Sequence, residues 1–405
     1  MNHTIHVAQT NTERVYLKWM WFTLALSGIV FVEPAPVDIF SMVMFGGGVF
    51  LGYVKFHRNV SFVSCLLWLF LLANLVSLYF AKDTIRGVQY VFVTGYLILF
   101  FFFLIGVLNH FRTRGLSMLF SGYVAAAILS AIIGILTYFE IIPFSEKLMT
   151  AGRIKALFKD PNVFGPFLVP VALYSFARIS STVRAVKLGW ATVFSITSMS
   201  VFLSFSRAAW INYILSILLF ILLRTVNGTA KEKLKTCLMF LLSLLILTSL
   251  FFILFKYTEV GDMFTQRFGL QEYDQDRFST QKIALESAMT YPLGIGPGQS
   301  EIVFQYSTHS LYARILSENG ITGFLSFITF VCVTCWRSLK LALRSTPKQQ
   351  YYMVCTAALI GVVINSLVVD TLHWRHFWFL LAVPWVYEHT EQWGESSFAN
   401  GKKLG

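Results

Sequence analysis

Two residues whose types suit catalysis stand beside long apolar segments of this sequence. His309 occurs in QYSTHSLYARILSENG, where Ser307 or Thr308 is a candidate helix cap. An imidazole titrates near neutral pH, so His309 is a candidate general acid or base. Arg207 occurs in LSFSRAAWIN between two apolar runs, where its guanidinium is a candidate anion ligand. A structural histidine and an interfacial arginine beside Trp210 are the alternatives.

Further charged residues lie in polar segments that are far apart in the sequence. A guanidinium forms paired hydrogen bonds with a phosphate, so arginines that converged in space would indicate a phosphate-bearing ligand. Arg314 and Glu318 are four residues apart and predict an ion pair on one helix face. The additional candidates are Arg153, Asp160, Arg267, Arg277, Arg314, Asp370 and Arg375.

The glycines of MTYPLGIGPGQS (289–300) permit tight turns shortly before His309. They do not form a dinucleotide fingerprint, because no strand of a parallel sheet precedes them. The sequence contains no H-E-x-x-H motif and no cysteine–histidine cluster with zinc spacing. We therefore expect a metal-independent reaction without a cofactor.

The composition indicates that the elements carrying these residues belong to a membrane protein. The chain of 405 residues is 56% hydrophobic and 13% charged, with a mean hydropathy of +0.65. Soluble domains carry about 25% charged residues. This composition excludes a soluble enzyme, a secreted disulfide scaffold and a disordered chain. The net charge of +12 then reflects basic cytoplasmic loops rather than a nucleic-acid surface.

The apolar segments predict an all-α, polytopic membrane protein with about twelve transmembrane helices in a single domain, 1–405. Each segment approaches the length of about 20 residues that crosses a bilayer. The predicted spans are 17–33, 37–54, 60–80, 88–108, 116–139, 162–179, 186–203, 208–224, 236–255, 311–335, 351–369 and 375–388.

Most lysines and arginines fall in alternate connecting segments and at the two termini. The positive-inside rule places those segments and both termini in the cytoplasm. The remaining segments define an outer face, of which 256–310 is the largest loop. Within that loop, residues 269–292 predict an amphipathic helix.

Five motifs resemble the O-antigen ligase and polymerase family of bacterial envelope proteins. The likeness covers roughly residues 150–385. The motifs at 308–325 and 370–382 are the most specific of the five. The motifs are FKDPNVFGPFLVP (158–170), SFSRAAW (204–210), DRFSTQKIALESAMTYPLGIGPGQS (276–300), THSLYARILSENGITGFL (308–325) and DTLHWRHFWFLLA (370–382).

The resemblance implies a GT-C-like fold and a metal-independent inverting glycosyltransferase. Such proteins transfer glycan from undecaprenyl pyrophosphate at the outer face of the cytoplasmic membrane. It implies that His309 is the essential histidine and Arg207 the arginine after the seventh span. Arg277 matches a second arginine, with Arg267 as a competing assignment. The remaining motif residues implied for substrate binding are Arg153, Asp160, Arg314, Asp370 and Arg375.

The resemblance also implies partners. These are a lipid-linked glycan donor, a glycan or lipid A-core acceptor, membrane lipids and, as a candidate, a chain-length regulator protein, but no nucleic acid. The KDPN and DTLHWRHFW motifs favour a polymerase or exopolysaccharide member over a ligase. A flippase or transporter is the main alternative, although no internal repeat supports it. A structural subunit of an assembly complex is a further alternative.

Overall fold

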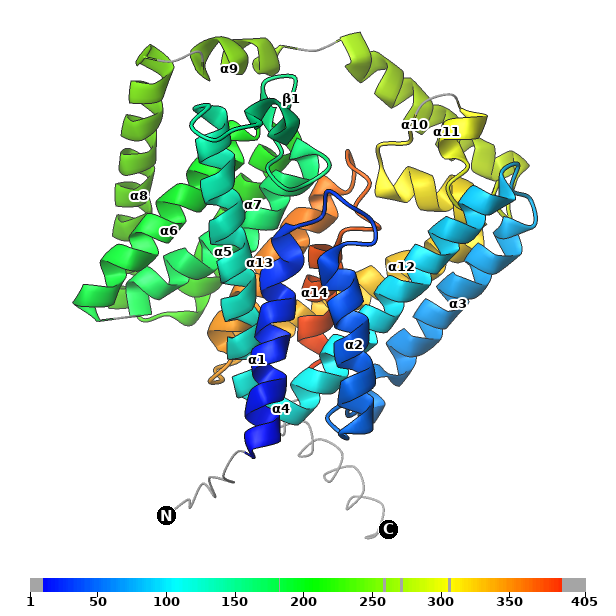
Figure 1. The fold of residues 1–405 in the computed structure, drawn as a ribbon, viewed down its shortest axis with the longest axis horizontal. Helices are drawn as coiled ribbons and strands as arrows, with labels where there is room; N and C mark the ends of the chain where they lie inside the picture. Colours follow the sequence, from blue (N-terminus) through cyan, green and yellow to red (C-terminus); the bar gives the residue numbers. More distant parts are fainter. Residues whose placement is uncertain (1–9, 182, 258–259, 270–271, 305–306, 388–405) are drawn as a thin grey trace.

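The computed structural model describes residues 10–181, 183–257, 260–269, 272–304 and 307–387. Helices account for nearly all of the regular structure (Figure 1). The α-helices are α1 (Asn11–Ala25), α2 (Pro36–Phe50), α3 (Ser61–Leu78), α4 (Thr84–Tyr138), α5 (Pro161–Ser181), α6 (Arg184–Leu203), α7 (Arg207–Asn227), α8 (Ala230–Tyr257), α9 (Val260–Phe268), α10 (Glu272–Thr290), α11 (Ser300–Val303), α12 (Leu311–Leu343), α13 (Gln349–Asn365) and α14 (Arg375–Ala382).

Short elements complete the described part of the chain. The strands β1 (Met149–Thr150) and β2 (Arg153–Ile154) form an antiparallel hairpin. The 3₁₀ turns are η1 (Leu26–Gly28), η2 (Arg58–Val60), η3 (Ser145–Leu148) and η4 (Val383–Trp385).

Six helices in the described residues are long and apolar enough to cross a membrane. This confirms an all-α membrane protein, whereas the number of twelve spans stays a prediction. The six segments are Arg58–Leu78, Thr84–Tyr138, Pro161–Ile179, Val186–Leu203, Arg207–Val226 and Leu311–Leu343.

Helix α4 joins two predicted spans, 88–108 and 116–139, into one element of 55 residues. The expected cytoplasmic loop between them is reduced to a kink at Arg112, whose φ is 54°. Helix α14 is only 8 residues long. At 1.5 Å per residue it extends roughly 12 Å, far less than the thickness of a bilayer core.

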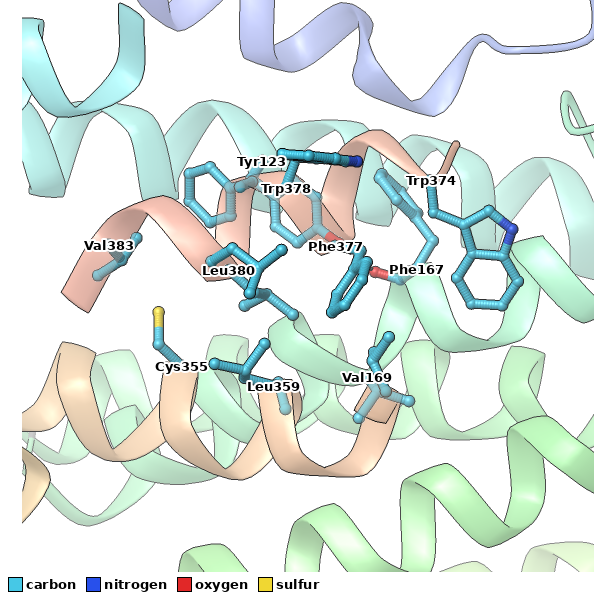
Figure 2. Close-up of a cluster of buried hydrophobic side chains, with 14 of the residues drawn as sticks. Tyr123, Phe167, Val169, Cys355, Leu359, Trp374, Phe377, Trp378, Leu380 and Val383 are labelled. Carbon is cyan, nitrogen blue, oxygen red and sulfur yellow. Dashed lines mark hydrogen bonds between the residues drawn. The ribbon is translucent and has the colours of Figure 1, made fainter. Parts of the chain in front are cut away.

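The core is built around α14, which is buried among other helices. Figure 2 shows Trp378 and Leu380 of α14 between Tyr123, Phe167 and side chains of α13. The ring of Tyr123 stacks with that of Phe379 at a centroid distance of 5.5 Å. Cys355 is fully buried against this cluster, which agrees with a packing role for the thiol.

The elements of the predicted outer face lie toward one end of the molecule. Figure 1 shows the β1–β2 hairpin, α9, α10 and α11 at this end, and the beginning of α1 at the other. The predicted loop 256–310 contains α9, α10 and α11. The helix expected over 269–292 is present as α10, which buries a narrow stripe of small residues at Thr280, Ala284 and Ala288.

Candidate functional site

The glycine segment before α11 docks onto an interruption in α12. Gly320 breaks α12 with a φ of 69°, and Gly294 has a φ of 90°. The amide of Ile321 donates to the carbonyl of Pro292 at 3.0 Å. A Cβ on Gly320 would lie 2.4 Å from that carbonyl oxygen, and one on Gly294 would lie 2.3 Å from the carbonyl oxygen of Glu318. Both glycines are therefore required by positive φ and by close backbone contact.

Glu318 fastens this segment to α12 through its carboxylate. It is 3% exposed and accepts hydrogen bonds from the amides of Gly298, at 2.7 Å, and Ser300, at 3.0 Å. The guanidinium of Arg314 donates a third bond from Nε at 3.1 Å. The ion pair predicted from the four-residue spacing is therefore present.

Arg314 lies at the centre of a buried charge cluster. It is 5% exposed, and its Nη1 pairs with a carboxylate oxygen of Asp370. Its Nη2 lies 3.3 Å from the hydroxyl of Tyr90 and 3.8 Å from a carboxylate oxygen of Glu301. Together with Glu318, two further carboxylates thus compensate its charge. Such an arginine holds other protein groups in place.

Arg86, from the beginning of α4, extends the same cluster. It forms an ion pair with Glu301. Burial raises the pKa of Glu301, but Arg86 and Arg314 outweigh it and hold this pKa below its ordinary value. Burial likewise opposes ionisation of Asp370, and the neighbouring Arg314 lowers its pKa nonetheless. Both carboxylates are therefore ionised at neutral pH.

Arg375 does not pair with the carboxylates around Arg314 but with Asp38 of α2. Its Nε and Nη2 each donate to one carboxylate oxygen of Asp38 at 2.6 Å, a bidentate geometry. Asp38 also accepts from the amide of Ala35 at 2.8 Å. Asp38 was not predicted as a site residue, because its place in the first turn of α2 after Pro36 indicates only a helix start.

A second cluster connects the KDPN and SFSR motifs. Arg153 donates from Nη2 to the side-chain oxygen of Asn162 at 2.9 Å, and Ser206 donates to the same oxygen at 2.6 Å. Asp160 is exposed and accepts from the amide of Asn162 at 2.6 Å. Ser206 caps α7, whose first residue is Arg207. Arg153 and Asp160 therefore fix the loops beside Arg207.

Arg207 is partly buried at the beginning of α7. Its Nη1 lies 3.4 Å from the carbonyl oxygen of Gly269, in the connection between α9 and α10. Arg267 is partly buried at the end of α9. Arg277 belongs to α10, but its side chain lies outside the described part of the structure. The choice between Arg267 and Arg277 therefore stays open.

His309 is partly buried two residues before α12 begins. The helix cap is Ser310, whose hydroxyl accepts from the amide of Ala313 at 3.4 Å, so the predicted cap at Ser307 or Thr308 was wrong. The amide of Leu311 donates to the carbonyl of Ser366 at 3.0 Å. This bond and the Arg314–Asp370 pair hold the start of α12 against the segment after α13.

A cavity of about 210 Å³ lies between the KDPN and DTLHWRH motifs. Lys159 contributes from the first motif, and Asp370 and Arg375 contribute from the second. Its lining, as far as the structure describes it, includes neither His309 nor Arg207. Among the predicted site residues, Arg314, Asp370 and Arg375 lie in one region. Arg153, Asp160 and Arg207 lie in another.

Several residues of these clusters were not assigned from the sequence. Tyr90, Arg86 and Glu301 come from segments that carry no recognisable motif. Glu301 was not predicted, although its position directly after the glycine segment is a signal that could have identified it. Within the described residues, no group of three or more potential metal ligands occurs. Independence from metals stays a prediction.

The fold and the clustered motifs define a polytopic α-helical membrane protein with a polar site at one end. Residues 192–328 match the O-antigen ligase family. This match includes Arg207, His309, Arg314 and Glu318, and it confirms the resemblance to the O-antigen ligase and polymerase family. A comparison with curated proteins found no match.

Proposed function

We propose that the protein transfers or polymerises glycan from an undecaprenyl-pyrophosphate-linked oligosaccharide at the outer face of the bacterial cytoplasmic membrane. The family match over residues 192–328 carries this proposal, because it includes both Arg207 and His309. The acceptor is a glycan or a lipid A-core. A chain-length regulator is a candidate partner, and both termini lie in the cytoplasm.

The reaction is a displacement at the anomeric carbon of the donor. The acceptor hydroxyl oxygen forms a bond to this carbon as the bond to the pyrophosphate oxygen breaks with inversion. The hydroxyl proton passes to an imidazole nitrogen of His309. The electron pair of the broken bond leaves with undecaprenyl pyrophosphate, whose growing negative charge is stabilised by Arg207 and Arg277.

The remaining charged residues have a positioning role in this proposal. Arg314 and Arg375 pair with carboxylates, which supports a positioning role for these two arginines. The hydrogen bonds of Arg153 with Asn162 and Ser204 support the same role for Arg153. Arg314 and Asp370 then orient the segment that carries His309.

The decisive experiment measures transfer by His309→Ala and Arg207→Ala variants with a purified lipid-linked donor. We expect each variant to lose activity by roughly a hundredfold or more while it accumulates in the membrane, because each removes a group that acts in the transition state. Arg344→Ala is the control, since Arg344 is exposed after α12 and outside the site. Full transfer by either site variant would refute the mechanism.

A deletion strain distinguishes the two acceptor classes. Loss of a polymerase leaves single repeat units attached to the carrier lipid or core, whereas loss of a ligase leaves none attached. Flux of a lipid or solute through proteoliposomes that does not depend on His309 would instead support a transporter.

A further inference from the structure

Helix α4 has the length of two membrane spans, which meet at the kink of Arg112. Its two arms, 84–111 and 113–138, extend roughly 40 Å each at 1.5 Å per residue, which is more than the thickness of a bilayer core. Because each arm is long enough to cross the core, the kink between them lies at a membrane surface. Figure 1 shows this bend and the start of α1 at the end of the molecule opposite to α9 and the β1–β2 hairpin.

Contacts of His110 and Asn109 bring α1 and the loop between α2 and α3 to this bend. The Nε2 of His110 lies 3.4 Å from a carboxylate oxygen of Glu13 in α1. The rings of Tyr53 and His110 have centroids 4.8 Å apart. Asn109 donates from Nδ2 to the carbonyl of Lys55 at 3.0 Å. Basic residues that neighbour these contacts in the sequence therefore gather on one surface.

Six lysine and arginine side chains of these three segments are exposed at this end of the molecule. None of the six forms an ion pair within the described part of the chain. The nearby carboxylate of Glu13 is already engaged by His110 and by the amide of Thr10. The uncompensated positive charge attracts anions, and guanidinium and ammonium groups both bind phosphate. This basic patch consists of Arg14, Lys18, Lys55, Arg58, Arg112 and Arg114.

Exposed aromatic side chains border the basic patch. Trp19 follows Lys18, and Phe56 follows Lys55, and both rings are about half exposed. Phe50, at the end of α2, is 89% exposed. Aromatic side chains at a membrane surface contact the outer part of the acyl region, while neighbouring cations reach the headgroups. The surface thus suits a ligand that has an anionic head and an apolar tail.

We infer that the basic patch binds anionic phospholipids of the adjacent leaflet, with the phosphodiester on the cations and the acyl chains against Trp19 and Phe56. Phosphatidylglycerol carries a net negative charge, whereas the ammonium of phosphatidylethanolamine compensates its own phosphate. Attraction to an anionic lipid increases with each cation, so a patch of six should discriminate between these two headgroups. The inference depends neither on the proposed glycan transfer nor on which face of the membrane carries the patch.

Native mass spectrometry of the purified full-length protein in detergent tests the inference. Dioleoyl phosphatidylglycerol and dioleoyl phosphatidylethanolamine are titrated separately, and we expect the first to bind at least about tenfold more tightly. Equal affinity of the two lipids would overturn the inference. Glycerol phosphate, a soluble anion without acyl chains, is the competitor. Displacement of phosphatidylglycerol by an equal concentration of glycerol phosphate would indicate a site for soluble anions and would also overturn it.

Two double variants locate the binding. Arg14→Gln combined with Lys18→Gln removes the two cations of α1, and Lys55→Gln combined with Arg58→Gln removes two cations beside α3. Each pair is exposed and breaks no ion pair of the described residues, so both variants should fold. We expect the affinity for phosphatidylglycerol to fall about tenfold in each and the affinity for phosphatidylethanolamine to stay unchanged.

Lys231→Gln combined with Lys233→Gln is the matched control. These two lysines are likewise exposed, but they lie in the first turn of α8, outside the basic patch. The control should bind phosphatidylglycerol as the wild type does. An equal loss of affinity in the control would show that any cation of the protein suffices, and wild-type affinity in both patch variants would place the lipid elsewhere. Either result would refute the assignment.

Discussion

The contacts of Arg314 show which interactions of a residue can be predicted from the sequence and which cannot. Its pair with Glu318 was predicted because four residues separate them on a helix, and the structure confirms it. Its contact with Asp370 joins positions 56 residues apart, and its contact with Tyr90 joins positions 224 apart. No local pattern encodes such distances. Convergence of arginines on a phosphate was therefore an assumption, and Arg314 instead meets carboxylates.

Replacing Arg314 should destabilise the protein strongly. Arg314→Met leaves the buried Glu318 and the partly buried Asp370 without their shared counter-charge. Removal of one partner from a buried pair costs about 3–5 kcal/mol. Thermal unfolding in detergent measures the effect, with Arg344→Met, an exposed arginine outside the cluster, as the control. Equal unfolding midpoints for the two variants would show that the cluster contributes little.

His373 should make the protein sensitive to mild acid. Its pKa falls from an ordinary 6.5 to about 4 in the folded protein because of burial. Between these values the unfolded chain binds a proton at this residue and the folded protein does not, so stability decreases as the pH falls. The lowered pKa values of Glu301 and Asp370 add a further loss at still lower pH, below their ordinary values of 4.5 and 3.8.

The measurement is the unfolding midpoint in detergent at pH 7 and pH 5. The wild type should lose stability over this interval, and His373→Asn should lose less because the titrating ring is gone. An unchanged slope in the variant would assign the acid sensitivity to other groups.

At the scale of elements, long apolar runs were predictable and their interruptions were not. The predicted span 186–203 agrees with α6, and 60–80 agrees with α3, because a run of hydrophobic residues is sufficient evidence for either. The kink that replaces the loop at Arg112 and the break of α12 at Gly320 depend on tertiary contacts. Helix α14 was predicted as a span although its neighbours bury it almost completely.

The break in α12 should tolerate only glycine. Gly320→Ala introduces a Cβ 2.4 Å from the carbonyl oxygen of Pro292 at a positive φ, which should cost about 1–3 kcal/mol. Gly46→Ala is the matched control, since a Cβ there meets no atom within 4 Å in helix α2. We expect a lower unfolding midpoint for Gly320→Ala and an unchanged one for Gly46→Ala. A wild-type midpoint for Gly320→Ala would show that the contact between α12 and the glycine segment accommodates a Cβ.

At the scale of the whole molecule, motifs from distant parts of the chain gather at one end because the helices that carry them run antiparallel. The distribution of lysines and arginines predicted that the connecting segments alternate between two faces. Figure 1 agrees with this separation for the β1–β2 hairpin, α9 and α11. The grouping of residues within that end was not predictable. The Arg375–Asp38 pair, for example, joins positions 337 residues apart.

Chemical labelling should establish which end faces outward. Single cysteines at Glu140 and Arg58, both exposed, report on the two ends in a background without the native cysteines Cys65, Cys237, Cys332, Cys335 and Cys355. A membrane-impermeant thiol reagent added to intact cells should label Glu140→Cys and leave Arg58→Cys unlabelled until the cells are opened. The reverse pattern would invert the proposed orientation.

The alternating charges of Arg86, Glu301, Arg314 and Asp370 have a consequence for protein engineering. Each ion interacts with its neighbours, and Glu301 lies within 4 Å of both arginines. A designer who grafts the α12 segment onto a related scaffold must therefore transplant the acidic residues from the other segments with it. The smallest portable unit of this site is an assembly drawn from α4, α11, α12 and the residues after α13, rather than any single stretch of sequence.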